Sequence, residues 1–100
     1  MKLHIQSISD IITNSSSEVF LEITSGEQSA LNTVFDLLKN YFPEDDADLY
    51  PVVNMESHTV YLSLPYGIDS WEFFEDGVRA ILENKLDKNT FELILSLIHI

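Results

Sequence analysis

The chain has 100 residues, the length of one domain, and its seventeen acidic residues outnumber five basic ones to give a formal net charge of −12. This charge opposes direct contact with nucleic-acid phosphates and with anionic membrane surfaces, and it favours basic protein partners. A hydrophobic content of 45% predicts a folded globule, and the absence of cysteine excludes disulfides and thiolate metal sites.

Two short strands are predicted near the N-terminus, with a polar loop between them. Leu3 and Ile5 alternate with polar residues, which predicts a strand over residues 2–8. The short polar side chains of residues 13–17 compete with the backbone for local hydrogen bonds and predict a loop. Alternation over residues 18–24 predicts the second strand, which we expect to pair with the first.

The polar loop contains a cluster of candidate interaction residues: Asn14, Ser15, Ser16 and Ser17. Clustered hydroxyls and N–H groups can form an anion-binding nest or a modification site. The simpler interpretation is a solvated connection, which is favoured because a phosphate-binding loop needs glycines and a lysine that this loop lacks.

A first helix is predicted from Ser25 to Phe42, and it is the clearest element of the pattern. Ser25 and Gln28 have the spacing of a capping box, and Pro43 would end the helix. Apolar residues recur at helical spacing and would form one buried stripe. These residues are Leu31, Val34, Phe35, Leu38, Tyr41 and Phe42.

Four acidic residues follow the helix within a five-residue stretch: Glu44, Asp45, Asp46 and Asp48. A solvated loop is the favoured interpretation, because an EF-hand would need longer spacing and a central glycine. No metal site is expected from His4, His58 and His99 either, since their spacing does not suit a shared ligand set. We expect no cofactor.

Two strands, residues 49–55 and 59–64, are predicted around a short hairpin turn. A second helix then begins near residue 69, where Asp69 and Glu72 have capping-box spacing. Its predicted buried stripe contains Trp71, Phe74, Val78, Ile81 and Leu82, and its predicted solvent side contains Glu72, Glu75, Asp76 and Glu83. Gly77 weakens this helix, and a packing contact would explain its presence.

The last element has two interpretations. Phe91, Leu93 and Leu95 alternate with their neighbours, which favours a closing strand. A helix capped by Asn89 with Glu92 is the alternative. The strand is favoured because it completes a sheet.

Both ends of the chain resemble known sequences. Residues 11–20, Ile-Ile-Thr-Asn-Ser-Ser-Ser-Glu-Val-Phe, resemble the N-terminal opener of small uncharacterised proteins from bacteria and phages, notably phages of gut Bacteroidales. The resemblance implies a phage source and carries no activity. Residues 1–6 lack the pattern of a signal peptide and no apolar run approaches the length of a bilayer span, so we expect the protein in the cytoplasm of a host cell or in a virion. Residues 95–100, Leu-Ser-Leu-Ile-His-Ile, resemble a translated sequencing adaptor and would be a non-native tail. The other interpretation is a genuine apolar strand end.

The element order predicts an α+β fold, specifically a ferredoxin-like βαββαβ two-layer sandwich with an extra N-terminal edge strand. Residues 1–94 would form one domain, with residues 1–17 as its N-terminal strand and serine-rich loop. Both helices would pack against Val19, Leu21, Ile23, Val60, Leu62 and Leu64, and the open sheet face would carry Phe20, Glu22, Tyr61 and Ser63.

No catalytic constellation is present: the sequence lacks a nucleophile elbow, a glycine-rich phosphate loop and an HExxH motif. We therefore expect a non-enzymatic protein-interaction module that binds a protein partner through its open sheet face, with Phe20 and Tyr61, or through its acidic surface. A second hypothesis is an acidic nucleic-acid mimic, which needs its carboxylates along one face. A third is a small-molecule regulatory domain, which needs a pocket. The oligomeric state is left open.

Overall fold

A computed structural model describes residues 1–7, 17–42, 51–65 and 71–97 of the chain. It contains five strands and two helices, and the predicted α+β class is confirmed. In chain order the elements are β1 (Lys2–Ser7), β2 (Ser17–Thr24), α1 (Gln28–Tyr41), β3 (Val52–Glu56), β4 (Thr59–Pro65), α2 (Trp71–Lys85) and β5 (Glu92–Leu97).

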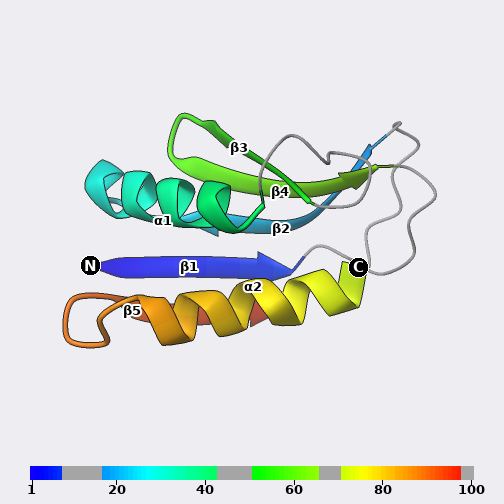
Figure 1. The fold of residues 1–100 in the computed structure, drawn as a ribbon. Coiled ribbons are helices and arrows are strands. Elements are labelled where there is room, and N and C mark those ends of the chain that lie inside the picture. Colours follow the sequence, from blue (N-terminus) through cyan, green and yellow to red (C-terminus); the bar gives the residue numbers. More distant parts are fainter. Residues whose placement is uncertain (8–16, 43–50, 66–70, 98–100) are drawn as a thin grey trace.

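The strands form one sheet in the order β3-β4-β2-β1-β5 (Figure 1). The prediction of an N-terminal edge strand is wrong, because β1 pairs antiparallel with β2 on one side and parallel with β5 on the other. The split βαβ arrangement would pair β5 directly with β2, so the strand order also differs from the ferredoxin-like expectation. Alternation in a sequence specifies which face of a strand is buried, but it does not specify which other strands pair with it.

The interior position of β1 is also supported by the residue that directly precedes the strand, Met1. The backbone N–H of Glu92 donates to the carbonyl of Met1 at 2.8 Å, and the N-terminal amino group donates to the carbonyl of Thr90 at 2.6 Å. The beginning of the chain is therefore hydrogen-bonded to the start of β5, although 89 positions separate Met1 from Thr90.

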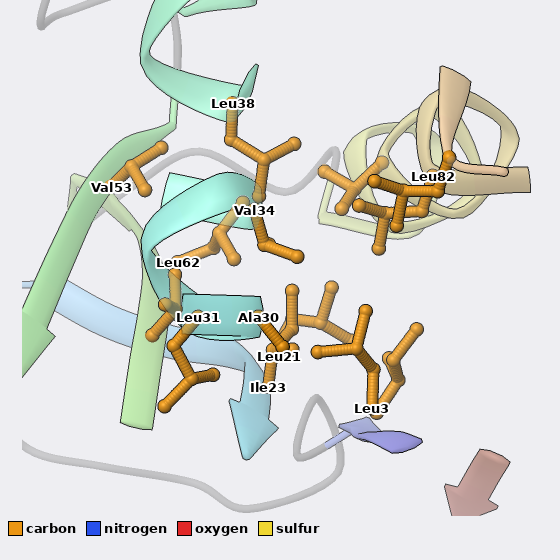
Figure 2. Packing of buried hydrophobic residues seen from close by; sticks show 14 of the residues in the cluster. Leu3, Leu21, Ile23, Ala30, Leu31, Val34, Leu38, Val53, Leu62 and Leu82 are labelled. Carbon is orange, nitrogen blue, oxygen red and sulfur yellow. The ribbon is translucent and has the colours of Figure 1, made fainter. Parts of the chain in front are cut away.

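The core lies between the sheet and the two helices (Figure 2). Alternate residues of β1, β2 and β4 are buried on one face, as period-2 strands require. The helices cover that face, and the rings of Phe42 and Phe74 approach to 6.5 Å between them. The fully buried members include Leu3, Ile5, Leu21, Ile23, Val60 and Leu62 of the sheet, Ala30, Leu31, Val34 and Leu38 of α1, and Val78 and Leu82 of α2.

The start of α1 differs from the predicted capping box. The helix begins at Gln28, and Ser25 is buried with its Oγ accepting the N–H of Glu27 at 3.2 Å. The Gln28 amide donates to Asn32 Oδ1 at 3.1 Å, so it does not reach back to Ser25. The end of the helix follows the prediction, since α1 stops at Tyr41, two residues before Pro43. The predicted cap of α2, Asp69, lies outside the described residues.

The predicted hairpin and closing strand are both confirmed. The antiparallel strands β3 and β4 are joined through Ser57 and His58, and Ser57 has a φ of 50°. The β5 segment is a strand and not a helix, because the edge of β1 supplies hydrogen-bond partners along its length. Asn89 does not cap a helix: its N–H donates to Asp87 Oδ1 at 3.0 Å within a turn.

Gly77 does not mark a close packing contact. A Cβ built on this residue meets nothing within 4 Å. We therefore expect Gly77→Ala to stabilise the protein by about 1 kcal/mol, because alanine has the higher helix propensity and no neighbour opposes it. Urea unfolding of the two proteins measures this difference. Gly26→Ala is the control, since Gly26 also has open space but lies before the helix. Loss of stability in Gly77→Ala alone would contradict the expectation.

Candidate functional site

The second face of the sheet is the first candidate site. None of the described helices covers it, because both helices contribute to the core on the other face. Register places four polar residues in one row across four strands: Asn54 pairs with Tyr61, Tyr61 with Glu22, and Glu22 with Gln6. Directly opposed side chains on one face lie about 5 Å apart. The row therefore forms a continuous polar strip with a half-exposed aromatic ring, Tyr61, at its centre.

A second row runs beside the first. It joins Glu56, Thr59, Thr24 and His4 through the same three strand pairings. Glu56 and His4 at its ends are exposed. Two further charged residues, Lys2 and Glu92, oppose each other on β1 and β5. These rows define the open sheet face, whose acids are Glu22, Glu56 and Glu92 and whose only lysine among the described residues is Lys2.

The structure supports the placement of three of the four residues predicted for this face. Glu22, Tyr61 and Ser63 alternate with buried neighbours and belong to it. Phe20 is different, because the register with β4 shifts between Val19 and Leu21. This bulge interrupts the alternation on which the predicted positions of Val19 and Phe20 depended. The side chains of residues 17–20 are outside the described part of the structure.

The other predicted interaction residues are mostly outside the described ranges. Asn14, Ser15 and Ser16 lie there, and so do Glu44, Asp45, Asp46 and Asp48. Ser17 is the first residue of β2 and pairs with Pro65, so the predicted polar loop ends one residue earlier than expected. The structure thus brings Ser17 to the sheet and leaves the roles of the serine and acidic clusters as hypotheses.

The prediction that Glu75 lies on the solvent side of the second helix is wrong. Its exposed fraction is only 8%, and its Oε1 lies 3.8 Å from Nη2 of Arg79. Glu75 Oε1 and the Nε and Nη2 atoms of Arg79 have no hydrogen-bond partner among the described residues. The sequence signal for this pair was the i, i+4 spacing of opposite charges. Asp76 and Glu83 are exposed as predicted. Because Glu75 is buried, it cannot belong to the continuous acidic face that the nucleic-acid-mimic hypothesis requires.

A groove lies between α2 and β5, where the sequence indicated no pocket. This groove has a volume of about 300 Å³. Leu95 in its lining is 50% exposed, whereas Leu82 on the helix and Leu86, which directly follows the helix, are buried. Apolar spacing on both elements was visible in the sequence, but their juxtaposition was not. The groove is lined by Leu82, Glu83, Leu86, Lys88, Phe91, Leu93 and Leu95.

The described residues show neither a metal centre nor a membrane-spanning helix. No three metal-ligating side chains come together within the described ranges. No helix in those ranges is both long enough and apolar enough to cross a bilayer. Comparison with known proteins adds no identity to these features: no protein-family model matches the chain, and no significant match is found among curated proteins or solved structures.

Proposed function

We propose that this protein is a non-enzymatic interaction module whose open sheet face binds a basic surface on a protein partner. The observation that supports the proposal is the polar row of Asn54, Tyr61, Glu22 and Gln6 on a face that the described helices leave uncovered. A half-exposed tyrosine among polar neighbours is typical of protein interfaces, where aromatic residues carry much of the binding energy.

Charge determines the expected class of partner. Among the described residues, the open sheet face contains three acids, Glu22, Glu56 and Glu92, against one lysine, Lys2. The whole chain carries a net charge of −12, which steers a basic partner toward it and repels nucleic acid. The resemblance of residues 11–20 to phage proteins makes bacterial host proteins and virion proteins the first candidates.

The test is affinity capture with the full chain from bacterial lysate, followed by measurement of the captured protein's affinity. Glu22→Lys should weaken binding by about tenfold or more, because it places a cation at the centre of the acidic face. Tyr61→Ala should weaken binding by a similar factor. The matched control is Asp36→Lys on α1, which makes the same charge change at an exposed position in the helix layer.

The comparison between the two lysine variants is decisive. If Asp36→Lys weakens binding as much as Glu22→Lys, net charge alone explains the interaction and the open sheet face is not the site. If neither variant nor Tyr61→Ala changes the affinity, the face does not take part. Competition by duplex DNA for the same partner would instead favour the nucleic-acid mimic.

A further inference from the structure

On the open sheet face, Tyr61 lies between side chains that accept hydrogen bonds on both neighbouring strands. Its cross-strand partner on β3 is Asn54, and its cross-strand partner on β2 is Glu22. Directly opposed side chains on one face have their Cβ atoms about 5 Å apart. The tyrosine ring therefore has an amide close to it on one side and a carboxylate close to it on the other.

A second carboxylate lies one row away, and no described lysine neutralises either of them. Glu56 is diagonal to Tyr61 across the pairing of β3 with β4, at a separation of about 7–8 Å. Neither Glu22 nor Glu56 forms an ion pair with another described residue. Lys2 is the one lysine in the described strands, and it opposes Glu92 on β1, two strands away from Tyr61. The surroundings of the ring are therefore acidic.

A guanidinium group can use the ring, the carboxylate and the amide together. It stacks on an aromatic face, pairs with a carboxylate through two parallel N–H donors, and keeps further donors for an amide oxygen. A lysine ammonium is a compact, strongly hydrated point charge that has neither the planar surface nor the fork of donors. The row of Asn54, Tyr61 and Glu22 therefore favours arginine over lysine.

This arginine has to come from another protein. Arg79 is the single arginine of the chain, and it lies 3.8 Å from the buried carboxylate of Glu75. Its Nε and Nη2 atoms are themselves buried. A second copy of the chain consequently has no accessible guanidinium to offer, and its net charge of −12 would repel the first copy.

We propose that Tyr61, Glu22 and Asn54 form an anchor point on the open sheet face that takes an arginine side chain of the protein partner. The guanidinium lies against the tyrosine ring and pairs with Glu22, and Glu56 adds a second negative charge nearby. This inference rests on the proposed function and narrows it, because a surface that is basic through lysine alone is then the weaker partner. Arginine is also one of the residues that most often dominate the binding energy of protein interfaces.

The probes are two fluorescein-labelled nine-residue peptides of glycine and serine, one with arginine and one with lysine at every third position. Each is titrated with the full chain at the same salt concentration and followed by fluorescence anisotropy. Because the two peptides carry the same charge, the ratio of their affinities reports on the guanidinium and not on net charge. We expect the arginine peptide to bind about fivefold more tightly.

Variants at Tyr61 test the role of the ring. Tyr61→Leu should weaken binding of the arginine peptide about fivefold and abolish the preference over lysine, whereas Tyr61→Phe should keep the preference because the ring remains. Phe73→Leu is the matched control, since it removes an aromatic ring at a 74% exposed position on α2. This control should leave the preference unchanged.

Variants of two acids test the role of the carboxylate. Glu22→Gln keeps the shape of the side chain and removes its charge, and it should weaken binding of the arginine peptide about tenfold. Glu83→Gln makes the same change at an exposed position on α2 and should have little effect.

Several outcomes would overturn the proposal. Equal affinity of the wild type for the two peptides would show that arginine is not selected. A preference that survives in Tyr61→Leu, or is lost equally in Phe73→Leu, would place the arginine elsewhere. Undetectable binding of both peptides at millimolar protein would reject the anchor point. In each case the proposed function still stands if Glu22→Lys weakens binding of the captured partner more than Asp36→Lys does. If these two lysine variants weaken that binding equally, the proposed function fails instead.

Discussion

Ile5→Ala should lower the free energy of unfolding by about 3 kcal/mol, because it leaves a cavity in a close-packed core. Ile5 is fully buried, and β1 places it between Ile23 of β2 and Leu95 of β5. For a domain of this size the corresponding decrease in melting temperature is roughly 15 °C. Chemical unfolding followed by circular dichroism measures the change. A loss below about 1 kcal/mol would be incompatible with this burial.

Ile94→Ala is the matched control for that substitution. Ile94 lies on β5, pairs with His4 and is only partly buried on the open sheet face. Its truncation should cost about 1 kcal/mol. Hydrogen exchange then tests the position of β1 directly: consecutive amides of Leu3 to Ser7 should be protected, since both edges of the strand are paired. Fast exchange at every second amide would indicate the edge position that the sequence predicted.

Breaking the ion pair between Glu75 and Arg79 should also lower the free energy of unfolding substantially. Arg79→Met leaves the buried carboxylate of Glu75 without its cation, and we expect a loss of about 2 kcal/mol. The loss is smaller than for a fully buried pair because the Arg79 side chain is 23% exposed. Adding Glu75→Leu should restore the stability of the wild type or exceed it by about 1 kcal/mol, because desolvation of the unpartnered atoms is relieved.

The double-mutant cycle needs unfolding data on the wild type, both single variants and the double variant. Asp76→Leu provides the control, because Asp76 is a neighbouring acid on α2 that is exposed and should change stability by no more than about 0.5 kcal/mol. A double variant less stable than both single variants would contradict this expectation, because it would show that Glu75 and Arg79 contribute to stability independently of each other.

Only some residues of the candidate sites could be predicted from the sequence. Tyr61, Glu22 and Ser63 could be assigned to the open sheet face because alternation continues unbroken through β4 and the second half of β2. Phe20 could not be assigned, since a bulge depends on how two strands meet and leaves no signal in either one. The groove was missed because its walls, α2 and β5, come together only in the folded chain.

The sequence by itself determined most of the local structure: the helix α1 and its end before Pro43, the hairpin between β3 and β4, and the strand character of β5. The predicted buried stripe of α1 is correct for Leu31, Val34 and Leu38 and wrong for Tyr41, which is 43% exposed at the end of the helix. These features depend on periodicity and on backbone chemistry that each residue carries with it. Only the tertiary structure decided the insertion of β1 between β2 and β5, the burial of Glu75 and the position of β5 as the last strand of the described sheet. Each of these depends on which elements become neighbours, and that choice is made by the packing of the whole core.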